Sequence, residues 1–345
     1  MNIPNYSSAL ERSPWIDRIK IFAAFLVVLQ HSISPVWSTF PVDTITWKIT
    51  NLIFIFSRSA VILFFMCSGA GMLKHPRSIE NVLKKNVLPL LKVYFCWMLI
   101  YGFFDSISLI QSGSASIRTI SNAFLKCILF GKYHTWFIFA LIGLYLITPF
   151  LSSITFDYKH MSFFLLLSFF FTILVPLLSS ISLLDRLTLQ LNHFHLNYIT
   201  GYILYYIIGY FISSLEWKKS YSRFALLLFC FSYIFAFIYS TGISLRRGAP
   251  SQEIYDEFGI CGFFIAISVF ALFKGKSIWK ERKICTILLQ SGIGIYLLHP
   301  LLLPLFESYT GLQRMAVSIV LYGLVVFICQ LINRSRLFQY LLLKS

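Results

Sequence analysis

Long apolar runs separated by short polar gaps dominate this sequence. Ten of them reach the length of roughly 20 residues that a helix needs to cross the hydrocarbon of a bilayer. Only 12% of the 345 residues are charged and 58% are hydrophobic, whereas ordinary soluble domains carry about 25% charged residues. A soluble domain of this size has too little interior to bury so much apolar surface. We therefore predict an all-α polytopic integral membrane protein with one transmembrane domain over residues 1–345. The ten predicted transmembrane helices cover residues 16–36, 51–73, 87–107, 135–153, 161–183, 199–215, 224–242, 258–273, 286–305 and 315–333.

Positive charges are distributed unevenly over the gaps between these runs. The gaps on the side of both chain ends hold 19 lysines and arginines, and the opposite gaps hold 8. Because cytoplasmic loops carry the excess of Lys and Arg in membrane proteins, we expect both termini to face the cytoplasm. The net charge of +16 therefore reflects membrane topology and does not indicate a nucleic-acid partner.

The stretch RIKIFAAFLVVLQHS, residues 18–32, places an ionisable ring inside the first run. On a helix, His31 would lie about 16 Å from Lys20, in the outer half of the membrane. An imidazole takes up protons near neutral pH, and an ionisable group at this depth is costly unless it has a function. His31 is therefore a candidate catalytic base, and a hydrogen bond between helices is the structural alternative.

The second and third runs add basic residues with competing interpretations. Arg58 begins the second run on the outer side, where an anchor that reaches for the membrane surface would also lie. The small residues of CSGAG, residues 67–71, favour close helix packing. The third run opens with Lys84 and Lys85, typical cytoplasmic charges, and Lys92 lies deeper. Lys92 would either extend to the surface or meet phosphate groups from the cytoplasm.

Two further histidines lie in later runs. His134 and Trp136 cluster at the outer start of the fourth run, where an aromatic belt explains the Trp but not the His. Tyr296 and His299 lie three residues apart in the ninth run, on one helix face, although a kink at the following proline is an alternative role for His299. The histidines show no ligand spacing such as His-x3-His, and acidic residues are almost absent from the runs, so we predict no metal site.

Four motifs together resemble one family. WIDRIKIFAAFLVVLQHS is similar to the opening signature of the acyltransferase family 3 membrane proteins, in which a basic residue precedes a histidine by ten intervening residues. RSAVILFFMCSGAGML, YHTWFIFALIGLYLITPFL and GIGIYLLHPLLL resemble later motifs of that family, in the same order and over nearly the whole chain. The YHxWF element looks closest to the branch that O-acetylates bacterial surface polysaccharide such as enterobacterial common antigen.

The resemblance implies a bacterial enzyme of the cytoplasmic (inner) membrane with ten helices. Its acyl donor would be acetyl-CoA, used as a substrate and not bound permanently, and its acceptor a sugar hydroxyl on a polysaccharide or an undecaprenyl-linked sugar. Carried over by position, His31 becomes the base. Cytoplasmic cations would meet the coenzyme A phosphates, and these candidates are Arg18, Lys20, Lys84, Lys85 and Lys92. The candidate acceptor-binding residues are Arg58, His134, Trp136, Tyr296 and His299.

Two positions depart from the family pattern. Lys20 stands where the family usually has Arg. A lysine ammonium is a point charge and cannot form the bidentate hydrogen bonds of a guanidinium. The basic pair of the family's third helix falls on Asn86 and Pro89 in this chain. The alternative function is an exporter or flippase of a polysaccharide or lipid-linked sugar. We see no inverted repeat of the kind that many transporters carry, and a transporter leaves the pairing of Lys20 with His31 without a role.

Overall fold

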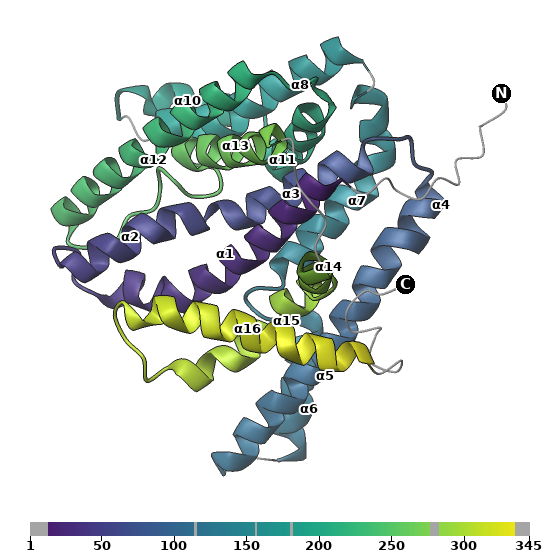
Figure 1. Ribbon diagram of the computed structural model, residues 1–345, viewed down its shortest axis with the longest axis vertical. Coiled ribbons are helices and arrows are strands. Elements are labelled where there is room, and N and C mark those ends of the chain that lie inside the picture. Colours follow the sequence, from purple (N-terminus) through teal and green to yellow (C-terminus); the bar gives the residue numbers. More distant parts are fainter. Residues whose placement is uncertain (1–12, 114–115, 156, 180–181, 277–282, 335–345) are drawn as a thin grey trace.

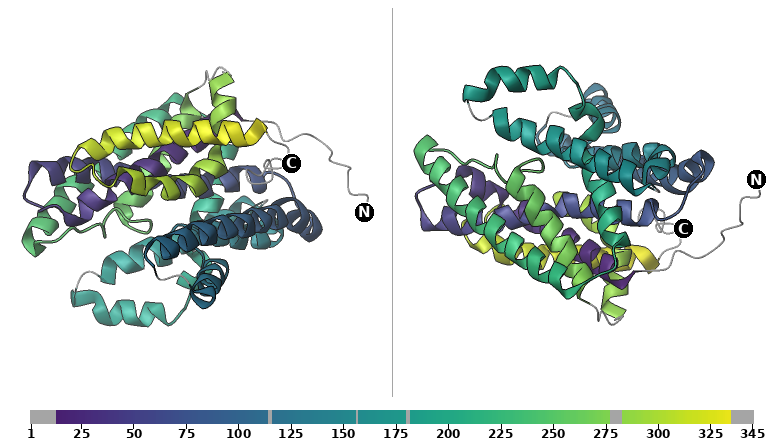
Figure 2. Two further views of the ribbon diagram at one scale, coloured as in Figure 1. Left: turned by 90° about the horizontal axis from the view of Figure 1, so that it is seen from below. Right: turned by 90° about the horizontal axis from the view of Figure 1, so that it is seen from above.

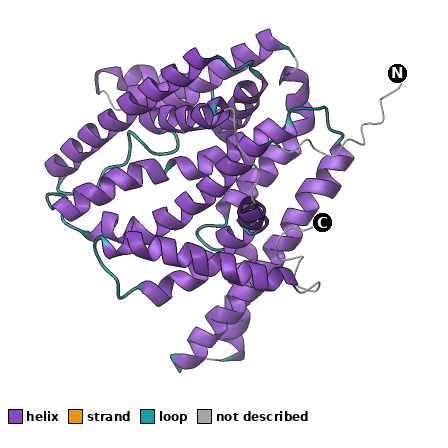
Figure 3. Cartoon of the chain, in the orientation of Figure 1, coloured by secondary structure: helices purple, strands orange, loops and turns teal. Residues whose placement is uncertain are grey.

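The computed structural model of the protein describes residues 13–113, 116–155, 157–179, 182–276 and 283–334. In this part of the chain every regular element is a helix and there is no strand (Figures 1 and 3), which confirms the predicted all-α fold. The helices of eight or more residues are α1 (Pro14–Thr39), α2 (Ile45–Ser57), α3 (Ser59–Met72), α5 (Leu88–Gln111), α6 (Ile117–Phe130), α7 (Trp136–Thr155), α8 (Tyr158–Phe169), α10 (Asp185–Asn192), α11 (Asn197–Ser214), α12 (Lys219–Arg247), α13 (Ile260–Gly275), α14 (Lys283–Gln290), α15 (Gly292–Leu302) and α16 (Gln313–Arg334). Shorter pieces are α4 (Ile79–Val82), η1 (Leu83–Val87), η2 (Phe170–Leu174), α9 (Val175–Ser179), η3 (Ser182–Leu184) and η4 (Leu303–Phe306).

Each of the ten predicted runs coincides with a helix or with a broken helix. Among the described residues, seven helices are long and apolar enough to cross a membrane, and the bent pair α14 and α15 would make an eighth crossing. The shorter helix α13 is apolar as well, and α11 has a kink at Gly201, where φ is +30°. The chain is thus a multi-pass membrane protein, and the count of ten crossings stays a prediction.

The second run differs most from its predicted bounds. Its helix begins at Ile45, because the hydroxyl of Thr44 accepts a hydrogen bond from the backbone N–H of Trp47 and caps the first turn. The helix then breaks at Arg58, so that α2 and α3 form one apolar stretch over Ile45–Met72. The prediction that Arg58 begins this run at the outer surface is therefore wrong, because Arg58 lies in its middle.

Two other breaks also differ from the expected pattern. A π-helical segment, η1, leads into α5 within one continuous helix over Ile79–Gln111, and Pro89 follows directly after this segment, in the first turn of α5. The ninth run bends by 62° between α14 and α15. Pro300 lies inside α15, near its end, so this bend falls before His299 and Pro300.

Close packing of α3 against α11 forms the centre of the molecule. A methyl group added at Gly69 would lie 1.7 Å from the carbonyl oxygen of Tyr206, and one at Gly209 would lie 2.0 Å from that of Met66. Only glycine allows two backbones to approach so closely, which confirms the packing role predicted for CSGAG.

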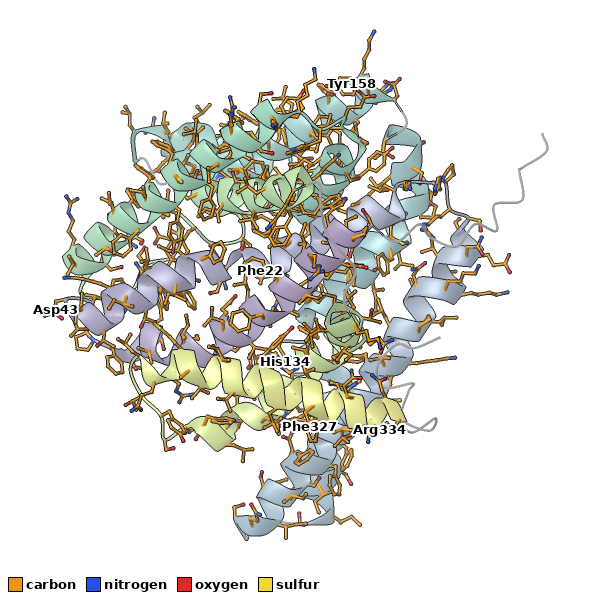
Figure 4. All side chains as sticks on the ribbon, viewed as in Figure 1. Phe22, Asp43, His134, Tyr158, Phe327 and Arg334 are labelled. Atoms are coloured by element: carbon orange, nitrogen blue, oxygen red, sulfur yellow. The ribbon has the colours of Figure 1, made fainter. Side chains whose placement is uncertain are left out.

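The helices are arranged in two groups. Figure 2 shows that α5 to α10 lie together on one side of the group formed by α1 to α3 and α12 to α16. Asp43, in the turn between α1 and α2, and Arg334, at the end of α16, lie at opposite ends of the molecule (Figure 4). The Asp43 end is the predicted outer end. The predicted orientation itself stays a prediction, and part of its basis lies outside the described residues, namely Arg12, Lys280, Arg282, Arg336 and Lys344.

Candidate active site

Three histidines that lie far apart in the sequence meet between the two groups of helices. The ring centroid of His31, on α1, lies 5.1 Å from that of His299, on α15. The ring centroid of His134, in the turn between α6 and α7, lies 6.3 Å from that of His299. His134 and His299 are 3% and 0% exposed, whereas His31 is half-buried. We call these three residues the histidine site, and Figure 4 shows His134 near the middle of the molecule.

Tyrosines surround the histidine site. The ring of Tyr133 lies 5.5 Å from that of His31, and the ring of Tyr296 lies 5.7 Å from that of His134. The hydroxyl of Tyr296 donates a hydrogen bond to the backbone carbonyl oxygen of His134. Tyr296 thus fixes the chain that carries His134.

A short turn delivers Tyr133 and His134 to the site. Gly131 ends α6 with φ at +68°, a conformation that favours glycine. The side chain of Thr135 then accepts a hydrogen bond of 3.1 Å from the backbone N–H of Lys132 and closes the turn. The local sequence GKYHT therefore forms a tight turn that directs the side chains of Tyr133 and His134 into the site.

An ion pair anchors this turn to α5. The ammonium of Lys132 lies 2.6 and 2.8 Å from the two carboxylate oxygens of Asp105. The thiol of Cys127, on α6, donates to the same carboxylate at 3.1 Å. Burial and this hydrogen bond raise the pKa of the Cys127 thiol to about 11, so it keeps its proton and remains a donor at neutral pH.

The hydrogen bonds of the two buried histidines assign opposite tautomers to them. Tyr101 donates its proton to the carbonyl oxygen of Leu297 at 2.7 Å, so its oxygen is left to accept from Nε2 of His134 at 3.2 Å. Nδ1 of His299 donates to the carbonyl oxygen of Ile295 at 2.8 Å. The remaining ring nitrogens, Nδ1 of His134 and Nε2 of His299, are buried without a hydrogen-bond partner among the described residues. Each neutral ring therefore presents one open acceptor.

The site does not combine its ring nitrogens with carboxylates or thiols in a metal-binding group. Within the described residues, no three or more His, Cys, Asp or Glu side chains are placed to hold one metal ion.

A cluster of charged residues lies beside His31. The guanidinium of Arg58 contacts the carboxylate of Asp256 and lies 3.1 Å from that of Glu257. Gln30, the residue before His31, accepts a hydrogen bond from Nη1 of Arg58 at 2.9 Å and donates one to the carbonyl oxygen of Ser57 at 3.2 Å. We call Arg58, Gln30, Asp256 and Glu257 the Arg58 cluster. The side chain of Arg58 is only 13% exposed, so the alternative of an anchor at the membrane surface is wrong.

The loop between α12 and α13 carries the acidic residues of this cluster into the protein. A methyl group at Gly262 would lie 2.3 Å from the carbonyl oxygen of Asp256, so the loop folds tightly back onto the start of α13. The hydroxyl of Tyr255 donates to the side-chain oxygen of Asn51, on α2, at 2.9 Å. Sequence reasoning missed Asp256 and Glu257. The signal was present, because three of the 13 acidic residues of the chain fall within residues 253–257.

Trp136 belongs to an aromatic stack next to this loop. Its ring lies 5.6 Å from that of Tyr202 at an angle of 27°, and Tyr202 lies 5.0 Å from the ring of Phe258. Phe258 follows Glu257 in the sequence, so the stack joins Trp136 to the loop of the Arg58 cluster. The indole of Trp136 is partly exposed.

The candidate donor-binding residues lie at the other end of the molecule and are mostly exposed. Lys20 is exposed and Arg18 half-buried on α1. Lys84 pairs with Glu80 at 2.7 Å on its own helix, and this lysine is 69% exposed. Lys85 and Lys92 are exposed as well. The structure therefore brings His31, His134, His299 and Tyr296 together, but leaves these lysines on open surface.

Two residues at this end point inward, and sequence reasoning gave neither a binding role. Arg77 donates from Nε to the carbonyl oxygen of Met72 at 3.1 Å and from Nη2 to that of Gly71 at 3.3 Å. Asn86, in η1, has a buried side-chain oxygen without a partner in the described part of the chain. A π-helical turn is often found at functional sites, and this was not visible in the sequence pattern.

Comparison with known proteins identifies the family. The chain matches the family model described as an acyltransferase domain over residues 13–334, which is most of its length. No curated protein and no solved structure matches the chain. The match supports acyltransferase activity in general and not the enterobacterial common antigen branch, which stays a prediction. With its several apolar helices, the chain belongs to family 3 of the membrane acyltransferases, as its four motifs predicted.

Proposed function

We propose that this protein is an O-acetyltransferase of the bacterial cytoplasmic membrane. It moves an acetyl group from cytoplasmic acetyl-CoA to a sugar hydroxyl of a lipid-linked or surface polysaccharide, with His31 as the base. The observation that carries this proposal is the position of His31, a half-buried imidazole 5.1 Å from the ring of His299 in a chain of the acyltransferase family.

His31 supplies the proton transfer that the reaction needs. Its imidazole takes the proton of the sugar hydroxyl while the hydroxyl oxygen attacks the thioester carbonyl carbon. A carbon–oxygen bond forms, the carbon–sulfur bond then breaks, and the leaving thiolate of coenzyme A receives the proton from His31. The products are the sugar acetate and free coenzyme A. A relayed acyl-enzyme would reach the same products in two steps.

Lys20 suits a contact with the donor. It precedes His31 by 11 residues on one helix, which is about three turns of ~3.6 residues, so both side chains lie on the same side of α1. The phosphates of coenzyme A would meet Lys20 and Arg18, with Lys84, Lys85 and Lys92 as further candidates. The extended pantetheine arm then bridges the distance to His31.

The acceptor would bind around the histidine site. His134 and His299 offer open ring nitrogens, and Trp136 offers a partly exposed indole against which a sugar ring can stack. Arg58 is fixed beside His31 through Gln30, at the side of the site where the acceptor would bind. Tyr296 acts indirectly, because its hydroxyl holds the backbone of His134.

Mass spectrometry of the surface glycan tests the function. Cells without this gene are complemented with the wild type, with His31→Ala, or with His160→Ala, which removes an exposed histidine of α8 as a control. We expect the mass increment of an acetyl group on the glycan with the wild type and the control, and none with His31→Ala at equal protein level. Glycan that stays inside the cell in the deletion and His31→Ala strains, in normal amount, would indicate an exporter instead.

A further inference from the structure

We propose that His134 and His299 bind two hydroxyl groups of the acceptor through ring nitrogens of opposite tautomer. The acceptor is then a polyol that offers one hydroxyl to His31 and neighbouring free hydroxyls to Nδ1 of His134 and Nε2 of His299. This inference rests on the proposed function and deepens it, because it states which part of the sugar must stay unmodified.

The two open nitrogens are unusual for a packed interior. Buried polar atoms nearly always have a hydrogen-bond partner, and one without a partner costs free energy. A histidine with a purely structural role would be satisfied at both nitrogens or would expose the second one to water. His134 and His299 instead each use one nitrogen for the protein and leave the other buried and open.

The chemistry of these nitrogens selects the kind of group that binds. A neutral imidazole nitrogen without a proton only accepts hydrogen bonds, so its partner must be a donor. Carboxylates, phosphodiesters and the thioester carbonyl have no proton to donate at neutral pH. A sugar hydroxyl does donate. One sugar can reach all three rings, because the ring centroids of His31 and His299 lie 5.1 Å apart and those of His299 and His134 lie 6.3 Å apart.

The opposite tautomers allow a matched pair of substitutions at each histidine. Glutamine places its amide oxygen near the position of Nε2, and asparagine places its own near the position of Nδ1. At His299, glutamine therefore restores the open acceptor, whereas asparagine restores only the donor to Ile295. At His134 the assignment is reversed, because asparagine restores the acceptor and glutamine the donor to Tyr101.

A structural role of His134 and His299 and a hydroxyl-binding role predict opposite orders of activity for their asparagine and glutamine variants. The assay uses the purified protein in nanodiscs, acetyl-CoA, and chemically de-O-acetylated surface glycan of the source cells as the acceptor. We expect His299→Gln and His134→Asn to keep most of the acceptor kcat/KM. We expect His299→Asn and His134→Gln to lose it roughly tenfold or more, the effect of one hydrogen bond left unmade. The KM for acetyl-CoA should stay unchanged in all four variants.

The outcomes separate this inference from the function on which it rests. Absence of acetyl transfer by the wild type would contradict the proposed function. An active wild type whose variants follow the reverse order would overturn only the hydroxyl-binding role. Loss of wild-type activity on treatment with a chelator would also overturn it, by assigning the two nitrogens to a metal ion.

A spectroscopic measurement tests the tautomers even where a variant fails to fold. The wild-type protein is labelled with ¹⁵N-histidine, and the imidazole nitrogen shifts of its His134 and His299 are recorded without substrate. We expect the proton on Nε2 in His134 and on Nδ1 in His299. The same tautomer in both rings, or two protonated nitrogens in either ring, would overturn the inference.

Discussion

The predicted outer half of the molecule and its predicted cytoplasmic end place polar residues in different ways. In the predicted outer half, the candidate residues come from separate segments of the chain and are held by hydrogen bonds, such as that between His134 and Tyr101 and that between Arg58 and Gln30. At the other end, Lys84 and Lys92 stand exposed on helices that pack without them. In the proposed mechanism, the chemistry therefore depends on a prearranged site, whereas binding of the long donor depends on surface charge.

This difference has a physical reason. A catalytic base must hold its acceptor within hydrogen-bond reach and in a fixed orientation, which requires side chains locked by packing. A phosphate group is recognised by charge over a longer range, and flexible lysines at a wet surface are sufficient for that task. We expect substitutions in the outer half to affect stability and acceptor use together, and those at the other end to affect donor use alone.

Removal of Arg58 should have the largest effect on stability. Arg58→Leu leaves the carboxylates of Asp256 and Glu257 without their counter-charge. Loss of one partner of a buried pair costs ~3–5 kcal/mol, and we expect about 3 kcal/mol here, because Asp256 is 39% exposed and partly screened by water. A control in the same loop region is Arg247→Leu, whose pair with Glu253 is exposed on both sides. Thermal unfolding in detergent should show a large loss for Arg58→Leu alone, and equal losses would contradict a special role of the Arg58 cluster.

The contact between α3 and α11 should be the next most sensitive. Gly69→Ala places a methyl group against the backbone of Tyr206, where neither chain can move without shifting a helix. We expect a destabilisation of roughly 1–3 kcal/mol, as for other overpacked interiors. Gly71→Ala, two residues away on the same helix, meets no atom within 4 Å and should be neutral or slightly stabilising. If both variants unfold at the wild-type temperature, α3 and α11 do not pack as closely as described.

The ion pair below the His134 turn should have a smaller effect. Lys132→Met removes the anchor to Asp105, and since both side chains are partly exposed we expect a loss of about 1 kcal/mol. Because the turn carries Tyr133 and His134, the KM for the acceptor should rise while that for acetyl-CoA stays the same. Lys126→Met, at an exposed position of α6, serves as the control. A rise in the acetyl-CoA KM with either variant would contradict the separation of the two ends.

Hydrophobicity made the helices predictable, and tertiary packing made their breaks unpredictable. The runs at 16–36 and 315–333 lie within α1 and α16, because lipid selects such runs by composition alone. The break at Arg58 was not visible in the pattern, and the carboxylates that contact Arg58 come from a loop almost 200 residues later. The concentration of acidic residues at 253–257 marked this loop, but charges in a gap between apolar runs normally face water, so the sequence did not indicate that Asp256 and Glu257 pair with Arg58.

The histidine site shows the same limit. His31 was identified from its depth in an apolar run, and His134 and His299 from their positions in later runs and from the family resemblance, but their roles remain predictions. No pattern in the sequence places Tyr101 between His134 and Leu297, because that contact joins helices from different parts of the chain. The tautomers follow only from these contacts, and so does the inference about neighbouring hydroxyls.

Replacement of Lys20 should have the smallest effect on stability and the most selective effect on kinetics. Lys20→Ala removes an exposed charge, so the unfolding temperature should not change. If Lys20 meets a phosphate of coenzyme A, the KM for acetyl-CoA rises a few-fold and the acceptor KM does not. Lys20→Arg restores the fork geometry usual in the family and should keep or raise activity. Lys159→Ala is the control, because it removes an exposed lysine of α8 that has no proposed role in donor binding. Equal changes of both KM values in Lys20→Ala would show that Lys20 acts only through its long-range electrostatic effect and does not contact the donor. The inward-pointing Arg77 and Asn86 would then be the stronger candidates for donor binding.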